Sequence, residues 1–372
     1  MIRFDAVSKV YPDGTTAVDT LDMVIPEGRI TVLVGSSGCG KTTTLRMINR
    51  MIEASSGTVT VGGRNIADLD ENTLRRGIGY VIQQSGLFPH KTVLDNVATV
   101  PRLLGWDKKK ARARAAELME TVGLPESMAD RYPHQLSGGQ QQRVGVARAL
   151  AADPPVLLMD EPFGAVDPVV RTLLQDELLR LQSELRKTIV FVTHDIDEAV
   201  RLGDRIAVFR TGGRLVQFAP PAELLARPAD EFVAGFLGAQ RGLKLLSLTS
   251  LSEVPTIPVA TVEQRVSVAE ALATAARAGD RWLLAVREDG APRGWLDTDG
   301  LDGTEGSVAG HVLVAAAAVG GADSLLAALD AVVASPCGLV VRVDDQGRVA
   351  GASTERDVID AASRYRDGVM AS

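Results

Sequence analysis

Short apolar runs that end at polar residues are the clearest pattern in the first two thirds of the chain. Three such runs lie at residues 30–34, 156–159 and 189–193. They end at a glycine-rich stretch, at a pair of acids and at His194, and runs of this kind predict buried parallel strands. Helical patterns lie between them, as over residues 108–122 and 169–186. Strands that alternate with helices predict an α/β fold whose ligands bind at the carboxyl ends of the strands.

The last third of the chain follows a different pattern, which occurs twice. An alanine-rich helix, an apolar strand, a charged turn and a second strand follow one another in each copy. The helices are expected at residues 268–278 and 324–334, and the first strands at 282–286 and 338–343. Gly294 and Gly351 open the second strands, which gives a repeat of about 57 residues. We therefore expect a first domain, a linker and a double module at residues 1–240, 241–256 and 257–372, the module dividing into about 257–311 and 312–372.

Composition narrows the class of protein. At roughly 100–200 residues per domain, the 372 residues suffice for two or three domains. The 47 acids outnumber the 40 bases, which argues against nucleic acid as the main partner. Most of this excess lies after residue 240, where 18 acids face 12 bases. Two cysteines cannot form a disulfide framework and indicate a reducing compartment. No apolar run approaches the roughly 20 residues that span a bilayer.

The strongest chemical signal is the glycine-rich stretch at residues 35–42, Gly-Ser-Ser-Gly-Cys-Gly-Lys-Thr. It fits the phosphate-binding pattern G-x-x-x-x-G-K-[ST], in which glycines let backbone N–H groups converge on phosphate oxygens. Lys41 supplies a positive charge for the β- and γ-phosphates, and the Thr42 hydroxyl suits Mg²⁺. The helix that follows, through Leu45 and Ile48, points its positive N-terminus at the same anion. The motif predicts a nucleotide-binding site.

Two further motifs extend the predicted site. The run at 156–159 ends at Asp160, which can hold Mg²⁺ through water, and Glu161, which can polarise an attacking water. Residues 136–140 read Leu-Ser-Gly-Gly-Gln, and Ser137 can cap a helix over residues 138–150. The hydroxyl and the free N–H groups of that helix start would then face an anion.

In this order the motifs resemble the ATP-binding subunit of an ABC transporter, over residues 1–240. The resemblance implies a P-loop NTPase fold, the ABC ATPase, with a helical subdomain, and it implies bound ATP and Mg²⁺. Gln83 matches the loop glutamine that senses the γ-phosphate and contacts the membrane subunit. Asp167 matches the loop at the dimer interface, and His194 the switch histidine. Tyr11 sits where the family stacks an aromatic ring on adenine.

Motifs and resemblance together give the expected site. The ATP-binding residues are Tyr11, Gly35, Ser36, Ser37, Gly38, Cys39, Gly40, Lys41, Thr42, Thr43, Ser137, Gly138, Gly139, Gln140 and Asp167. The residues expected to act in hydrolysis are Lys41, Gln83, Glu161 and His194, and those expected to bind the metal are Thr42, Gln83 and Asp160. Two chains are expected to form a head-to-tail homodimer, so that each ATP lies between one chain's phosphate loop and the other's residues 137–139. Glu161 would then be the general base or orient the water, and His194 would hold the γ-phosphate.

The stretches at residues 79–90, 235–239 and 241–244 resemble the ATPases of quaternary-amine importers. That family takes up glycine betaine, carnitine, choline or proline betaine. The resemblance implies an integral-membrane permease, a separate substrate-binding protein, no nucleic acid, and a place at the cytoplasmic face of the inner membrane. Three alternatives stay open: the same ATPase serving a polyamine, sugar or metal ion; a soluble ABC ATPase of DNA repair or translation; and a nucleotide sensor whose ATPase is vestigial.

The double module resembles a tandem pair of CBS domains, an α+β fold. In that family a Thr or Ser, followed three residues later by Asp, contacts nucleotide phosphate and ribose. Thr354 and Asp357 fit this pattern, whereas Asp297 and Gly300 stand at the matching positions of the first repeat. One site for an adenine nucleotide, or for cyclic di-AMP, is therefore expected in the second repeat. Dimer reinforcement without a ligand and sensing of ionic strength are the alternatives.

Overall fold

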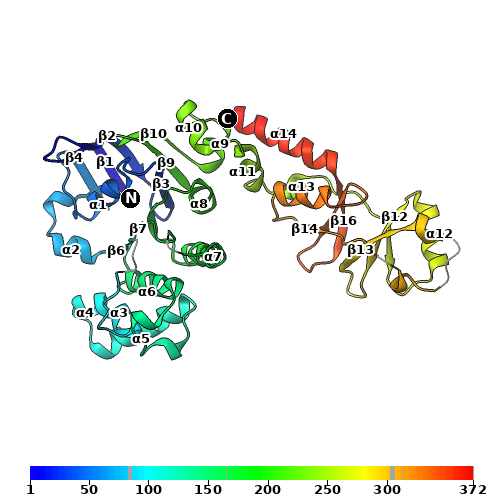
Figure 1. Ribbon diagram of the computed structural model, residues 1–372, viewed down its shortest axis with the longest axis horizontal. Coiled ribbons are helices and arrows are strands. Elements are labelled where there is room, and N and C mark those ends of the chain that lie inside the picture. The colour runs from blue at the N-terminus through cyan, green and yellow to red at the C-terminus, as the bar shows by residue number, and fades with distance from the viewer. Residues whose placement is uncertain (83–85, 165, 302–305, 312, 372) are drawn as a thin grey trace. The chain divides into compact units, whose positions relative to one another are not determined.

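The chain folds into two compact units. The computed structural model describes residues 1–82, 86–164, 166–301, 306–311 and 313–371 (Figure 1). Unit 1 comprises Met1–Leu224 and Pro228–Gly238, and unit 2 comprises Leu225–Arg227 and Ala239–Ser372. The main division, after Gly238, lies beside the domain boundary expected at residue 240.

A six-stranded sheet forms the centre of unit 1, in the order β10-β9-β3-β8-β7-β6. Its strands are β3 (Ile30–Gly35), β6 (Ile78–Val81), β7 (Val156–Asp160), β8 (Thr188–Val192), β9 (Arg205–Arg210) and β10 (Arg214–Ala219). All neighbouring pairs are parallel except β10 with β9. Every residue of β3, β7 and β8 is buried, as expected for strands covered on both faces. The three apolar runs of the sequence are these strands, which confirms the predicted α/β class.

A second, antiparallel sheet covers one side of unit 1, in the order β2-β1-β4-β5. Its strands are β1 (Ile2–Val10), β2 (Thr16–Ile25), β4 (Ser56–Val61) and β5 (Arg64–Asn65). One hydrophobic core joins residues of both sheets, such as Phe4 and Leu158. Helix α1 (Lys41–Ile48) contributes Leu45 and Ile48 to the same core, and both are fully buried. The helix that follows the phosphate loop is thereby fixed on its apolar face.

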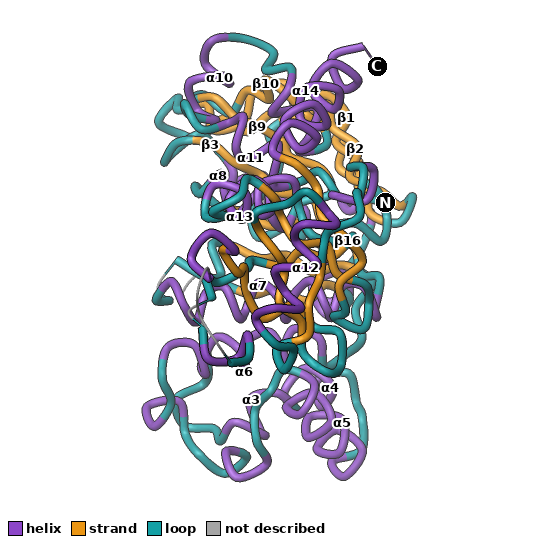
Figure 2. Tube along the Cα trace, turned by 90° about the vertical axis from the view of Figure 1, so that its right-hand side faces the viewer, coloured by secondary structure: helices purple, strands orange, loops and turns teal. Residues whose placement is uncertain are grey.

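A group of helices forms a separate layer of unit 1. The helices of the unit after α1 are α2 (Glu71–Arg76), α3 (Val93–Val97), α4 (Thr99–Leu103), α5 (Lys108–Thr121), α6 (Gly138–Leu150), α7 (Pro168–Leu185), α8 (Ile196–Leu202), the first four residues of α9 (Pro221–Ala226) and α10 (Glu231–Leu237). Helices α3 to α6 lie together in both views (Figures 1 and 2). The Arg112 Nη1–Asp95 Oδ1 ion pair, at 2.8 Å, joins α5 to α3. These helices are the expected helical subdomain, and α6 carries the Ser137 motif at its start.

Unit 2 contains two copies of one small motif. Its sheets are β11-β12-β13 and β14-β15-β16, and in each the first pair of strands is parallel and the second antiparallel. The strands are β11 (Thr261–Glu263), β12 (Trp282–Val286), β13 (Pro292–Asp297), β14 (Ala318–Gly320), β15 (Leu339–Val343) and β16 (Val349–Thr354). The helices are α11 (Arg241–Ser247), α12 (Val268–Ala278), α13 (Leu325–Val333) and α14 (Glu355–Ala371). The predicted internal repeat is present, because α12 and β12 recur 57 residues later as α13 and β15.

The segment expected as a linker, residues 241–256, is largely folded. It contains α11 and a 3₁₀ turn at Leu251–Glu253. Leu251 and Val254 are buried in the core of the second repeat, and the Leu251 N–H donates to the Asp323 carbonyl at 2.8 Å. Leu246 and Leu251 are apolar and pack in that core, so the segment lies on the repeat instead of running through solvent. None of the helices described is both long enough and apolar enough to span a bilayer.

Candidate active site

The phosphate loop joins β3 to α1 and depends on glycine at two positions. Gly35 has a φ of +150°, and a Cβ there would collide with the Phe209 carbonyl. Gly40 has a φ of +96°, and a Cβ there would collide with the Ala17 carbonyl. No side chain caps the start of α1, so its first N–H groups stay available to an anion.

Lys41 lies folded over this loop. Its Nζ donates to the Gly35 carbonyl at 2.7 Å and to the Ser36 carbonyl at 2.9 Å. The side chain is buried, so the loop holds a positive charge at its centre. Cys39 lies beneath it, with Sγ 3.7 Å from Nζ, and burial raises the pKa of the Cys39 thiol. The thiol therefore stays neutral and fills space below the phosphate site.

Thr42 and Asp160 meet beside the loop. The Thr42 hydroxyl donates to Asp160 Oδ1 at 2.8 Å, and the Asp160 carboxylate is buried at the end of β7. Hydroxyl and carboxylate oxygens are hard ligands of the kind Mg²⁺ takes together with nucleotide phosphates. The two residues thus fit the predicted metal site. The third predicted ligand, Gln83, lies outside the described residues.

Two residues that sequence reasoning missed support Asp160. Arg46 Nη2 and the Tyr80 hydroxyl each lie 3.5 Å from Asp160 Oδ2. Arg46 Nε also lies 3.4 Å from the Tyr80 oxygen. The pairing of β6 with β7 brings Tyr80 beside Asp160, and Arg46 reaches both from α1, so nothing in a single sequence marks these contacts.

Glu161 and His194 face each other at the carboxyl edge of the sheet. Glu161 follows β7, His194 follows β8 closely, and His194 Nδ1 lies 3.4 Å from Glu161 Oε2. Glu161 has a φ of +43°, a strained conformation for a non-glycine residue. Its N–H donates to the Val192 carbonyl at 3.0 Å, which fixes this geometry. The structure thus brings together the predicted base and the predicted switch histidine.

The Ser137 motif and Asp167 each cap a helix. The Ser137 hydroxyl accepts from the Gln140 N–H at 3.3 Å, and Gln140 Oε1 accepts from the Ser137 N–H at 3.0 Å. The predicted capped helix over residues 138–150 is therefore confirmed. Asp167 caps α7 by accepting from the Val170 N–H at 3.1 Å. Ser137, Gly138 and Asp167 are exposed, and α6 begins in the helical subdomain, apart from α1 (Figure 1).

Tyr11 lies beside the start of α1. Its hydroxyl is 3.4 Å from Thr43 Oγ1, and Lys9 Nζ is 5.4 Å from the centre of its ring. The ring is half-buried, so part of it stays open beside the phosphate loop. This is the neighbourhood that an adenine-stacking residue needs.

The two repeats of unit 2 differ at the predicted nucleotide positions. The Thr354 hydroxyl donates to Asp357 Oδ2 at 2.6 Å, and hydrogen bonds from Thr354 lower the pKa of the Asp357 carboxyl. In the first repeat Asp297 instead accepts from Arg281, from Nε at 2.8 Å and from Nη2 at 2.7 Å. An internal ion pair thus takes the place of the Thr–Asp pair.

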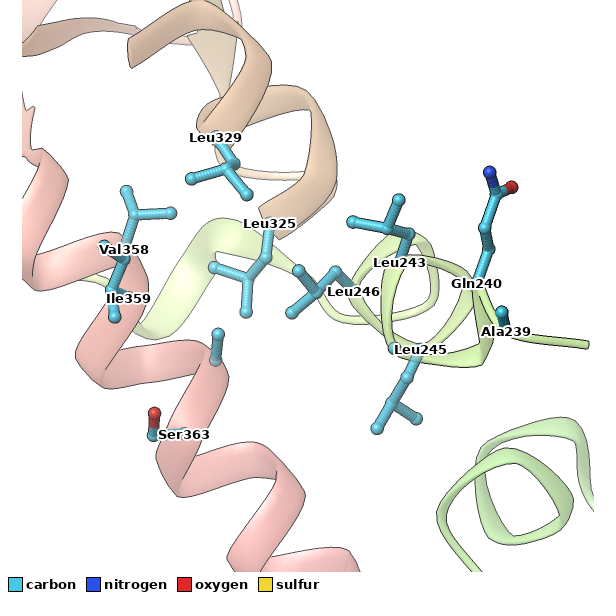
Figure 3. Close-up of a pocket in the computed structure, with 12 residues that line it drawn as sticks. Ala239, Gln240, Leu243, Leu245, Leu246, Leu325, Leu329, Val358, Ile359 and Ser363 are labelled. Carbon is cyan, nitrogen blue, oxygen red and sulfur yellow. The ribbon is translucent and has the colours of Figure 1, made fainter. Parts of the chain in front are cut away.

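Unit 2 also contains an apolar cavity of about 490 Å³ between α11, α13 and α14. Figure 3 shows leucines of α11 and α13 facing Val358 and Ile359 of α14. Thr354 and Asp357 are not among its lining residues. The cavity is therefore separate from the predicted nucleotide position of this unit.

The phosphate loop, the Thr42–Asp160 pair and the Glu161–His194 pair define an ATP-hydrolysing cassette. The model of the family described as "ABC transporter" matches residues 18–164. The chain is similar to a dimeric ATP-binding cassette solved in a post-hydrolysis state with ADP and Pi, with 36% identity and a TM-score of 0.55 over 59% of this chain and 99% of that one.

Curated relatives narrow the family. The osmoprotectant import ATP-binding protein OsmV of Salmonella typhimurium is 51% identical over 80% of this chain and 79% of its own length. The glycine betaine/carnitine/choline transport ATP-binding protein OpuCA of Bacillus subtilis is 46% identical over 81% of this chain and 80% of its own length. The chain belongs to the family of osmoprotectant import ATP-binding proteins of ABC transporters.

Proposed function

We propose that this chain is the ATP-hydrolysing subunit of an importer of quaternary ammonium solutes: glycine betaine, carnitine, choline or proline betaine. The observation that carries the proposal is the pairing of Glu161 with His194, 3.4 Å apart, beside the phosphate loop. The names of the relatives supply the class of solute, because they are osmoprotectant, glycine betaine, carnitine and choline transport proteins.

The chemical step follows from these positions. The loop and the start of α1 bind the phosphates, with Lys41 as the central charge. Thr42 and Asp160 would hold Mg²⁺, which neutralises charge on the phosphates. A water attacks the γ-phosphorus while Glu161 takes its proton, and the bond from γ-phosphorus to the bridging oxygen breaks to leave ADP. His194 beside Glu161 would hold the γ-phosphate in line with that water.

We propose a head-to-tail homodimer as the active form. Ser137, Gly138 and Asp167 are exposed at helix starts, where a second chain could bring them to the phosphates. The similar cassette with ADP and Pi is a dimer, which supports this arrangement. In the proposed homodimer of this chain, residues 137–139 of one copy would complete the ATP site that contains Lys41 of the other copy.

A groove in unit 1 offers a place for the membrane permease. It has a volume of about 330 Å³ and is lined by Ile82, Gly86, Phe88, Leu103 and Arg148, among others. Phe88 and Leu103 are exposed apolar side chains, and the described residues Ile82 and Gly86 also line the groove. We propose that a permease loop at the cytoplasmic face of the inner membrane docks here, and that a separate binding protein delivers the solute.

For unit 2 we propose one adenine nucleotide site, at Thr354 and Asp357. The Thr–Asp pair of the second repeat and the Arg281–Asp297 ion pair of the first support a single site. Dimer reinforcement and ionic-strength sensing remain the competing functions. Binding of cyclic di-AMP to the full chain separates them, because only the nucleotide site predicts binding that Asp357→Ala weakens.

The function is tested with the chain assembled with its permease and binding protein in liposomes. ATP-dependent uptake of radiolabelled glycine betaine should be competed by carnitine and choline, and not by putrescine or maltose. Glu161→Gln should stop the uptake. Competition by putrescine or maltose alone would favour the same ATPase serving another solute, and ATP hydrolysis indifferent to every solute would favour a non-transport ATPase.

A further inference from the structure

Two side-chain bridges join α7 to α8 next to the catalytic residues. Arg171, in the first turn of α7, donates through Nη2 to the Val166 carbonyl at 3.1 Å, and its Nη1 lies 3.8 Å from Asp195 Oδ2. One turn later, Gln175 Nε2 donates to Glu198 Oε1 of α8 at 3.0 Å. Helix α7 begins directly after Asp167, and α8 begins two residues after His194 (Figure 1).

The Asp195 carboxylate fixes the backbone that follows His194. Its Oδ1 accepts from the N–H groups of Asp197 at 2.8 Å and Glu198 at 3.3 Å, which caps α8. The Asp195 N–H donates to Thr193 Oγ1 at 3.0 Å, so both neighbours of His194 are held. The other oxygen of this carboxylate, Oδ2, faces Arg171 of α7. A shift of α7 would therefore displace the carboxylate that caps α8.

The second bridge is buried. Gln175 and Glu198 are 5% and 7% exposed, so neither can exchange its partner for bulk water. Burial raises the pKa of the Glu198 carboxyl, with hydrogen bonds from Thr193 and Gln175 acting in the opposite direction. A buried carboxyl is costly unless it is bonded, so this pair resists sliding of α7 along α8.

We propose that Arg171, Gln175 and Glu198 are positioning residues that couple the 166–167 segment to His194. The inference rests on the proposed hydrolysis at a dimer interface. When a second chain engages Asp167, the first turn of α7 moves with it, and the two bridges carry the displacement to the Asp195 cap and to His194. Hydrolysis is then efficient only when the second chain holds residues 166–167 in place.

The expected signature is a loss of kcat without a loss of ATP binding. None of the three residues is expected to contact ATP, so KM should stay within about twofold of wild type. A misplacement of His194 by about 1 Å should lower kcat about 10- to 100-fold. Arg171→Met keeps the length of the side chain and removes both contacts, and Glu198→Met does the same for the buried bridge.

Two matched variants separate positioning from general destabilisation. Glu198→Gln keeps an acceptor oxygen for Gln175, so kcat should stay within about threefold of wild type. Arg201→Met breaks another α7–α8 ion pair, Arg201 Nη2–Asp176 Oδ1 at 2.6 Å, at the end of α8 away from His194. It should leave kcat unchanged.

The experiment measures kcat, KM and the melting temperature of the full-length protein and its variants. Low kcat with near-normal KM in Arg171→Met, rescue in Glu198→Gln relative to Glu198→Met, and wild-type behaviour of Arg201→Met support the coupling. Wild-type kcat in Arg171→Met, an equal loss in Arg201→Met, or no rescue by the glutamine would overturn it. Arg171 is partly exposed, so that variant remains informative if Glu198→Met does not fold. An inactive wild-type protein would instead refute the proposed function.

Discussion

Replacing Thr42 by valine tests the geometry of the metal site without nucleotide. The substitution keeps the branched shape and removes one hydroxyl, which donates to Asp160 Oδ1 at 2.8 Å. Asp160 is 4% exposed, and its other partners, Arg46 and Tyr80, lie at the long distance of 3.5 Å. A hydrogen bond to a charged group contributes about 1.5–3 kcal/mol, so we expect the free energy of unfolding to fall by about 2 kcal/mol.

Calorimetry of the metal-free, nucleotide-free protein measures this loss. Unit 1 holds most of the first 240 residues. For a domain of that size, a loss of about 2 kcal/mol in the free energy of unfolding lowers the melting temperature by about 4–8 °C. The transition of unit 1 is the one that Mg-ATP raises in the wild-type protein. Thr43→Val is the matched control, because among the residues that the structure describes the Thr43 hydroxyl reaches Tyr11 alone, at 3.4 Å. A fall in Thr42→Val no larger than in Thr43→Val would refute the assigned contact.

Three further predictions concern other parts of the chain. Gly40→Ala should weaken ATP binding about 10- to 100-fold in a fluorescence titration, because its Cβ would meet the Ala17 carbonyl at a positive φ; unchanged affinity would contradict the loop geometry. Asp357→Ala should weaken binding of cyclic di-AMP in calorimetry and spare ATP hydrolysis, and equal binding by both proteins would argue for a module without a ligand at this position. Because burial raises the pKa of Glu198, the unfolded chain loses this proton first as pH rises, so stability falls between the usual pKa and the raised one. Urea unfolding of Glu198→Gln should lack that fall, and an identical pH profile would contradict the burial.

Local pattern was enough to predict much of unit 1. The runs ending at Gly35, Asp160 and His194 are buried strands because each apolar run had to be covered on both faces. The Ser137 helix begins at the predicted residue because capping depends on a few neighbouring positions. The 57-residue repeat was visible because each copy is a complete local unit.

Contacts between distant segments could not be predicted in this way. Arg46 and Tyr80 reach Asp160 from different elements, and only the fold brings the three together. Arg281 was not assigned any role, yet it pairs with Asp297, which stands where the second repeat has Thr354. Residues 241–256 were expected to be a linker, whereas Leu246 and Leu251 pack in the core of the second repeat.

We propose that Glu161 acts as the base in an ATP-bound homodimer. The most direct test measures ATP turnover and molar mass by light scattering for the wild-type chain and Glu161→Gln in Mg-ATP. Turnover in the variant should fall about 10²- to 10⁴-fold, while the variant accumulates as an ATP-bound dimer. Wild-type turnover in Glu161→Gln, or a variant that binds ATP and stays monomeric, would contradict it.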